Sequence, residues 1–135
     1  MRRDGLLNAE LLHAIAAMGH TDSLVVADAG LPAPPGVRVL DLAVVPGVPS
    51  VEAVARAVLR ELVVEAAVWA EEAARPESGM DSRFREWLQD LAPHAETRRV
   101  PHEEFKRLAG TARLIVRTGE FTPYANLLLY GGVPF

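Results

Sequence analysis

The chain has 135 residues, of which half are hydrophobic and about a quarter are charged, and its net charge is −4. This balance excludes a disordered chain, and the length suits one compact domain over residues 1–135. The absence of cysteine excludes a disulfide framework, a thiolate metal site and a cysteine nucleophile.

Charge and hydropathy also limit the partners that the chain could bind. The basic residues are scattered and form no stripe with interleaved aromatics, which argues against a nucleic-acid partner. No apolar run approaches the length of a bilayer span, so we expect a soluble cytoplasmic protein without a membrane partner. The mean hydropathy is slightly positive, which favours a homo-oligomer that covers part of the apolar surface.

The first half of the chain predicts helices and strands that alternate. Asn8 is a suitable N-cap for the first helix, and Gly19 ends that helix in the left-handed conformation. A shaped loop over 29–36 holds three prolines and two glycines, and Ser50 caps the second helix. The predicted elements are helices over 8–18 and 50–62 and strands over 24–27 and 37–42.

The second half continues the same alternation. Glu65 is the one charge in an apolar strand, which suggests a solvated group facing a sheet edge, and Asp81 or Ser82 caps the following helix. The predicted elements are strands over 63–70, 97–100, 112–117 and 127–130 and helices over 81–91 and 101–109. The aromatic side chains expected in the core are Trp69, Phe84, Trp87 and Phe105. This order predicts an α/β fold, a single three-layer domain whose mainly parallel sheet has helices on both faces.

Two titratable side chains lie at opposite ends of the strand over 24–27, His20 before it and Asp28 after it. Ligands bind at the carboxyl ends of strands in open α/β sheets, which favours Asp28 as a site residue. Further candidates at element ends or in loops are His102, Tyr124 and Asn126. These residue types suit acid–base chemistry. The sequence has no metal-ligand spacing, dinucleotide fingerprint, P-loop or nucleophile elbow, so we expect no metal and no cofactor.

Each candidate also has a purely structural explanation. His20 could interact with the last carbonyl groups of the first helix, and Asp28 could close a turn after its strand. His102 could be a solvated residue at a helix start, and Tyr124 and Asn126 could form a turn before the last strand. The residue types alone therefore leave both explanations open.

Several motifs stand in order along the chain, beginning with Gly19-His20-Thr21-Asp22 and the stretch 24–32. The others are Gly47-Val48-Pro49-Ser50, Val64-Glu65-Ala66-Ala67, His102-Glu103-Glu104-Phe105-Lys106, Arg117-Thr118-Gly119-Glu120, Pro123-Tyr124-Ala125-Asn126 and Gly132-Val133. Together they resemble the D-ribose pyranase family, whose relatives include the L-fucose mutarotases. The resemblance covers nearly the whole chain.

The resemblance implies an isomerase that interconverts β-D-ribopyranose and β-D-ribofuranose without a cofactor. It implies that His20 is the proton donor and that Asp28, His102 and the Tyr124-Ala125-Asn126 segment contact the sugar. It also implies a homodecamer of stacked pentamers, with each site built at a subunit interface. Two alternatives stay open: a mutarotase for another monosaccharide such as L-fucose, and a non-catalytic sugar-binding module.

Overall fold

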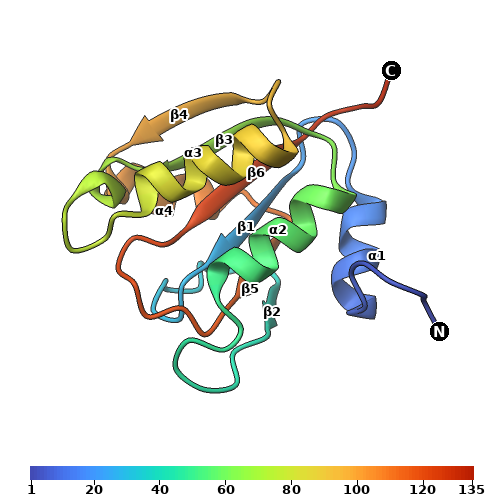
Figure 1. The fold of residues 1–135 in the computed structure, drawn as a ribbon, viewed down its shortest axis with the longest axis horizontal. Helices are drawn as coiled ribbons and strands as arrows, with labels where there is room; N and C mark the ends of the chain where they lie inside the picture. The colour runs from blue at the N-terminus through green and yellow to red at the C-terminus, as the bar shows by residue number, and fades with distance from the viewer.

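The computed structural model describes residues 1–135 and contains one six-stranded sheet (Figure 1). The strand order across the sheet is β2-β5-β1-β6-β3-β4. The strands are β1 (Ser23–Ala27), β2 (Val39–Asp41), β3 (Val64–Ala70), β4 (Glu96–Val100), β5 (Leu114–Arg117) and β6 (Leu127–Gly131). All six strands predicted from the sequence are therefore present.

Strand directions make the sheet mixed but mainly parallel. β1 pairs with β5, β2 with β5 and β3 with β4 in parallel, whereas β6 is antiparallel to both of its neighbours. Every residue of β1 is buried, and the register places Val25 beside Ile115 on one side and Leu128 on the other. The prediction of a mainly parallel sheet is confirmed, and β6 is its one reversed strand.

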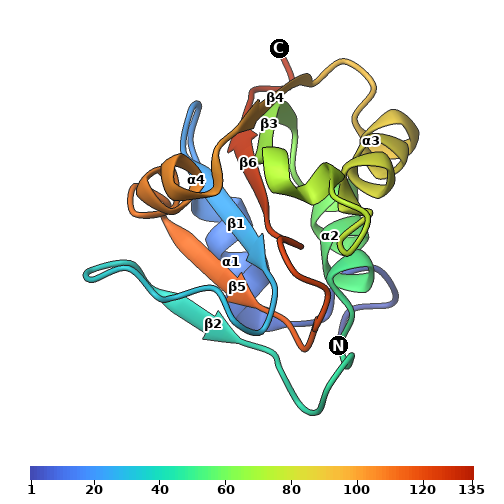
Figure 2. The ribbon, with the colours of Figure 1, turned by 90° about the vertical axis from the view of Figure 1, so that its left-hand side faces the viewer.

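Helices cover both faces of this sheet (Figure 2). The helices are α1 (Ala9–Ala17), α2 (Val51–Glu61), α3 (Met80–Leu91) and α4 (His102–Ala109), with a 3₁₀ turn η1 over Glu71–Ala74. Buried side chains of α1, α2 and α3 join one core cluster, and those of α4 join a second. β1 supplies Leu24 and Val26 to the first cluster and Val25 to the second, as expected for alternating side chains. The predicted three-layer arrangement is confirmed.

The predicted aromatic core is also confirmed. Trp69, Phe84, Trp87 and Phe105 are each at most 1% exposed. The ring of Phe84 lies 5.6 Å from Trp69 and 5.4 Å from Trp87, in tilted and edge-on orientations that aromatic pairs favour. These contacts fix α3 against β3. None of the helices has the length and apolar character that a membrane span requires.

Two of the predicted helix starts are confirmed by their caps. The Asn8 side chain accepts the Leu11 N–H in α1, and the Ser50 side chain accepts the Ala53 N–H in α2. The cap predicted for α3 is wrong, because the helix starts after Gly79, which has a φ of +65°. Asp81 instead accepts a hydrogen bond from the indole of Trp69 at 2.8 Å.

Candidate active site

Two side chains hold each other at the carboxyl end of β1. The Asp28 N–H donates to Asn126 Oδ1 at 2.8 Å, and Asn126 Nδ2 donates to Asp28 Oδ2 at 3.0 Å. The Gly30 N–H donates to Asp28 Oδ1 at 2.9 Å, in a short Asx-type turn. Asn126 is 1% exposed, whereas Asp28 is half-buried, so the carboxylate keeps acceptor positions open to a ligand.

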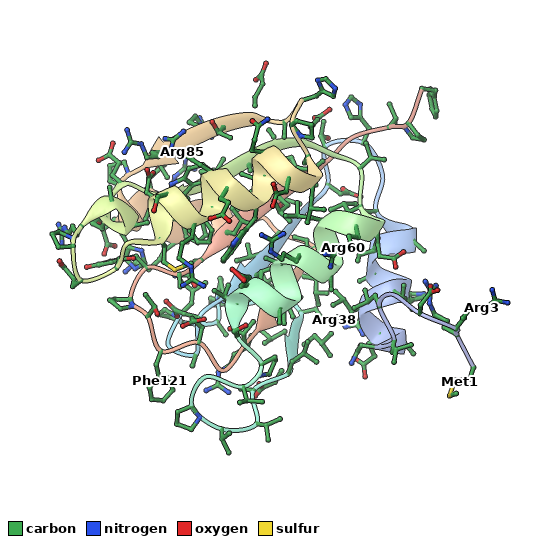
Figure 3. All side chains as sticks on the ribbon, viewed as in Figure 1. Met1, Arg3, Arg38, Arg60, Arg85 and Phe121 are labelled. Atoms are coloured by element: carbon green, nitrogen blue, oxygen red, sulfur yellow. The ribbon has the colours of Figure 1, made fainter.

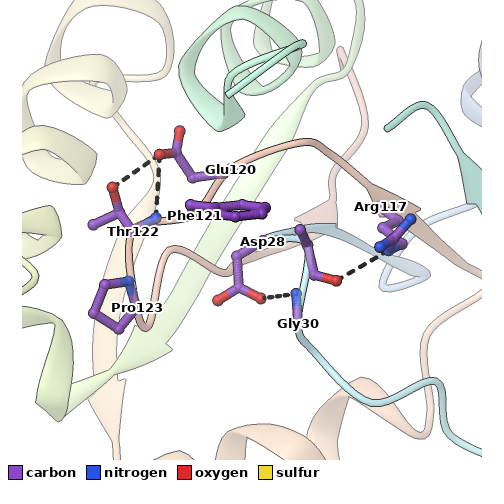
Figure 4. Close-up of a pocket in the computed structure, with 8 residues that line it drawn as sticks. Asp28, Gly30, Arg117, Glu120, Phe121, Thr122 and Pro123 are labelled. Atoms are coloured by element: carbon purple, nitrogen blue, oxygen red, sulfur yellow. Dashed lines mark hydrogen bonds between the residues drawn. The ribbon is translucent and has the colours of Figure 1, made fainter. Parts of the chain in front are cut away.

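Asp28 lies on a cavity of about 390 Å³. The other lining residues are Ala29, Gly30, Arg117, Glu120, Phe121, Thr122 and Pro123. Figure 4 shows the Asp28 carboxylate in its hydrogen bond to Gly30 and the ring of Phe121 in the same cavity. Small-molecule sites commonly occupy roughly 300–1,000 Å³, so the end of β1 has room for a small polar ligand.

The loop between β5 and β6 is tied to the end of β1 by a buried threonine. The Thr118 hydroxyl and N–H both donate to the Ala27 carbonyl oxygen, at 2.7 and 3.0 Å. The Ala29 N–H donates to the Glu120 carbonyl oxygen at 2.9 Å. These bonds hold the loop that carries Tyr124 and Asn126 beside Asp28.

Glu120 is fixed in this loop as a carboxylate. Partial burial alone would raise the pKa of its carboxyl, but hydrogen bonds from Thr122 and from the Val51 N–H more than offset this, and the pKa lies below its usual value. The Thr122 hydroxyl donates at 2.8 Å and the Val51 N–H at 3.1 Å. Glu120 therefore anchors the loop to the start of α2.

His102 and Tyr124 meet at the same edge of the sheet. Their ring centroids lie 5.1 Å apart with planes at 79°, an edge-on contact. His102 Nδ1 is buried and has no hydrogen-bond partner, which is rare for a buried polar atom. Tyr124 has a φ of +59°, a conformation that is uncommon and strained for an aromatic residue.

Two charged side chains around this pair were missed by sequence reasoning. Both carboxylate oxygens of Glu72 accept the His102 N–H, at 3.2 and 3.0 Å, which fixes the start of α4. Arg75 donates to the Tyr124 hydroxyl at 3.5 Å, and its guanidinium carbon lies 5.7 Å from the centre of the ring. Both residues follow the carboxyl end of β3, so the rule that selected Asp28 could have found them.

The structure thus brings five predicted site residues to one edge of the sheet, which we call the carboxyl edge. They are Asp28, His102, Tyr124, Ala125 and Asn126. Ala125 is fully buried. His20 precedes β1, and therefore lies at the opposite edge.

His20 stands in a turn that is held on two sides. Asp22 Oδ2 accepts the Gly19 N–H at 2.8 Å and a hydrogen bond from Arg113 at 2.9 Å. The Gly19 N–H and then the Arg113 guanidinium lower the pKa of the Asp22 carboxyl. The prediction of a left-handed Gly19 is wrong: Thr21 takes that conformation, with a φ of +69°, and its N–H donates to the Gly131 carbonyl oxygen at 2.9 Å.

The His20 side chain is exposed and has one partner within the chain. Its Nε2 lies 2.7 Å from Oε2 of Glu65 in β3. The expectation that Glu65 is solvated is confirmed, because the residue is exposed, but it does not face a sheet edge, since β3 lies between β6 and β4. The alternative explanation, in which His20 contacts the last carbonyl groups of the first helix, is not observed.

Comparison with known proteins gives consistent likenesses over the whole chain. A D-ribose pyranase of Paracidovorax citrulli is 50% identical over 135 residues, and one of Bacillus subtilis is 42% identical, each with full coverage of both chains. The solved structure of Bacillus subtilis RbsD complexed with D-ribose covers all of both chains, with a TM-score of 0.88 and 41% identity.

More distant structures share the fold alone. A fucose mutarotase of Streptococcus pneumoniae in complex with L-fucose has a TM-score of 0.76 and 21% identity, with 95% of this chain and 94% of that one covered. The family model described as the RbsD / FucU transport protein family matches residues 1–134. With full-length relatives at up to 50% identity beside that match, the chain belongs to the RbsD / FucU transport protein family.

Proposed function

We propose that this protein is an isomerase that interconverts β-D-ribopyranose and β-D-ribofuranose by acid–base-assisted ring opening and reclosure. The observation that carries this proposal is the carboxyl edge, where Asp28, held by Asn126, lies on a cavity and His102 Nδ1 is buried without a hydrogen-bond partner. Full-length relatives at 50% identity named D-ribose pyranase support the same activity. The same proposal places the enzyme in the cytoplasm.

The carboxyl edge suits a sugar that is rich in hydroxyl groups. Asp28 lies on the cavity, and its carboxylate can accept hydrogen bonds from hydroxyls. Tyr124 offers a ring face and a phenol beside the imidazole. A site whose polar groups are placed to bond hydroxyls rejects sugars that lack them, because those polar groups would then have no hydrogen-bond partner.

The acid–base residue in this proposal is His20, and it comes from a neighbouring subunit. β1 has five residues and spans about 17 Å at a rise of roughly 3.3 Å per residue. A monosaccharide held by Asp28 therefore cannot reach His20 of the same chain. A homodecamer of stacked pentamers would bring the His20 edge of one chain to the carboxyl edge of another.

Ring opening needs one proton delivered and one removed. His20 gives a proton to the ring oxygen as the bond between C1 and that oxygen breaks, with the electron pair going to the oxygen. The anomeric hydroxyl loses its proton to water and becomes the aldehyde carbonyl. Reclosure adds the 4-hydroxyl to C1, with the proton transfers reversed, so the sugar keeps its atoms and electrons.

Saturation-transfer NMR on D-ribose tests the reaction directly. We expect added protein to speed exchange between the pyranose and furanose anomeric signals, and the His20→Ala variant to return that exchange to the rate in buffer. An unchanged ribose rate with faster anomer exchange of L-fucose would show a mutarotase. Ribose binding without any acceleration would show a sugar-binding module.

A mixing experiment tests the two-chain site. His20→Ala and Asp28→Asn chains are each expected to be inactive, but random co-assembly gives about one quarter of sites with both native residues. We therefore expect co-expressed chains to recover about a quarter of the native activity. Recovery of no activity would place both residues in a site within one chain.

A further inference from the structure

We propose that Glu65 is a positioning residue that orients the His20 imidazole for proton transfer, an inference that rests on the proposed function. Its carboxylate oxygen Oε2 lies 2.7 Å from His20 Nε2, a short distance typical of a charge-assisted hydrogen bond. No other side chain of the protein bonds to His20. The proposal assigns a role to a residue outside the sugar-contacting set.

The backbone of β3 directs Glu65 toward His20. The pairing of β3 with β6 shifts between Val64 and Ala66. Val64 pairs with Gly131 and Ala66 with the adjacent Tyr130, so β3 has one residue more than β6 here. Glu65 is the extra residue of this bulge. Bulges re-aim a side chain and are common next to active sites, whereas a regular strand would fix Glu65 by simple alternation.

Two glycines allow the His20 turn and Glu65 to approach each other. A Cβ on Gly131 would lie 3.2 Å from the Gly19 carbonyl oxygen, and one on Gly132 would lie 3.2 Å from the Glu65 Cβ. Either contact is tighter than side chains normally make. The Gly132 N–H also donates to the Val63 carbonyl oxygen at 2.8 Å, which closes the end of β6 onto β3.

The hydrogen bond assigns the two imidazole nitrogens to different tasks. An ionised carboxylate only accepts hydrogen bonds, so Nε2 must carry the proton that it shares with Glu65. Nδ1 is then the atom left to exchange a proton with the sugar, as a donor in the imidazolium and an acceptor in the neutral ring. Such an outer carboxylate fixes both tautomer and ring orientation.

Burial in the proposed assembly strengthens this pair. In the single chain the side chains of His20 and Glu65 are 56% and 40% exposed, and exposed ion pairs hold their geometry weakly. A neighbouring chain that seats its sugar against His20 removes water from the same place. The hydrogen bond then acts in a lower dielectric, where it orients the ring more firmly.

The test compares Glu65→Leu, Glu65→Gln and Glu96→Gln. Leucine removes the acceptor, and glutamine keeps one acceptor oxygen without the charge. Glu96 is the matched control, because it is an exposed carboxylate on the neighbouring strand β4 with no ion pair. Each variant is first checked for the native oligomeric state by analytical ultracentrifugation.

Two readouts separate positioning from a structural role. In Glu65→Leu we expect kcat for ribose ring exchange to fall about 10- to 100-fold with KM unchanged, a loss like that seen when the outer hydrogen-bond partner of a metal-ligating histidine is removed. Long-range ¹H–¹⁵N spectra should show native His20 protonated on Nε2 and mixed tautomers in Glu65→Leu. Glu65→Gln should recover most of kcat, and Glu96→Gln should match the native protein.

The inference is overturned if Glu65→Leu keeps native kcat, or if its His20 keeps the single Nε2 tautomer. If Glu65→Leu fails to assemble, the spectra of Glu65→Gln test the inference in its place. A Gln variant that keeps native kcat although its His20 tautomers are mixed would also contradict the inference. A native protein that does not accelerate ribose exchange refutes the proposed function instead. The His20 spectra then still decide whether Glu65 orients the ring.

Discussion

Asp28 and Asn126 exchange two hydrogen bonds across 98 positions of the chain, from the end of β1 to the start of β6. One bond runs from the Asp28 backbone to the Asn126 side chain, and the other joins the two side chains. The buried amide thereby fixes both the position and the rotation of the carboxylate. The Asp28 carboxylate is therefore held in one orientation rather than left free at a strand end.

Replacing Asn126 with alanine should therefore harm both stability and sugar binding. The change leaves the half-buried Asp28 N–H without its partner, which costs up to about 3 kcal/mol of the free energy of unfolding. It also frees the Asp28 carboxylate to rotate, so we expect KM for ribose to rise. Urea unfolding at fixed protomer concentration and ribose titration of the exchange rate measure the two effects.

Asn8→Ala is the matched control for this variant. Asn8 caps α1 through its side chain, and its loss costs about 1 kcal/mol of stability at a place remote from the carboxyl edge. We expect Asn8→Ala to lower stability without changing KM. If the two variants change KM equally, the effect of Asn126→Ala on KM comes from a general loss of stability. Asn126 then does not act on ribose binding by orienting the Asp28 carboxylate.

His20→Ala should remove most of the catalysis and leave the fold intact. A positioned proton donor contributes about 10²- to 10⁴-fold to rate, and we expect a loss in that range. His20 is exposed in a turn whose other bonds come from Asp22 and Thr21, so the unfolding midpoint should not move. Saturation-transfer NMR and thermal unfolding check the two parts.

His13→Ala serves as its control, since His13 is an exposed histidine of α1 that lies outside the cavity of Asp28. This variant should keep native activity and native stability. A His20→Ala protein that aggregates, or that loses its oligomer while His13→Ala does not, would assign His20 a structural role.

Much of the fold follows from local sequence signals. The predictions that were wrong depend on contacts between residues far apart in the sequence. The sequence predicts the six strands and the Asn8 and Ser50 caps, because the alternation of apolar residues and the cap residues can each be recognised within a few neighbouring positions. The α3 cap was misplaced because Asp81 bonds the distant Trp69 indole. Thr21 takes the strained conformation assigned to Gly19 because Gly131 and Asp22 hold the turn.

The candidate site likewise has residues that the sequence predicts and contacts that it does not. Strand ends and loops selected Asp28 and His102, because the topology of an α/β sheet gathers carboxyl ends at one edge. The reciprocal bond to Asn126, the clamp of Glu72 on α4 and the pairing of Glu65 with His20 each join residues at least 30 positions apart. No spacing in the sequence encodes such contacts.

Asp22 should make stability depend on pH in the acidic range. Its pKa is lowered in the folded chain by the Gly19 N–H and Arg113, so ionised Asp22 stabilises the fold. This contribution is complete above the ordinary value of 3.8 and is lost as pH falls through the lower folded value. Asp22→Asn should therefore be less stable than the native protein at neutral pH, with the difference vanishing in acid.

Urea unfolding of both proteins from pH 7 to pH 2, at one protomer concentration, measures this difference. Asp4→Asn is a suitable control, because Asp4 is exposed and makes no ion pair. A difference between Asp22→Asn and native protein that stays constant down to the lowest pH would contradict the role of the Asp22 charge.

Phe121 should contribute to self-association. It is 70% exposed on the cavity beside Asp28 and points outward from its loop (Figure 3). Hydrogen bonds between Gly47 and Gly119 and between Gly119 and Pro49 join this loop to the segment that carries three exposed valines. Those valines are Val44, Val45 and Val48. An apolar surface of this kind beside a candidate site suits coverage by a second copy of the chain.

We expect Phe121→Ser to weaken the assembly by up to about 3 kcal/mol for each interface, the gain from fully burying a phenylalanine side chain. Sedimentation velocity over a dilution series should show the variant dissociating at higher concentration than the native protein. Leu7→Ser is the control, because Leu7 is 66% exposed but lines no part of the cavity. Identical sedimentation of Phe121→Ser and native protein would remove Phe121 from the interface.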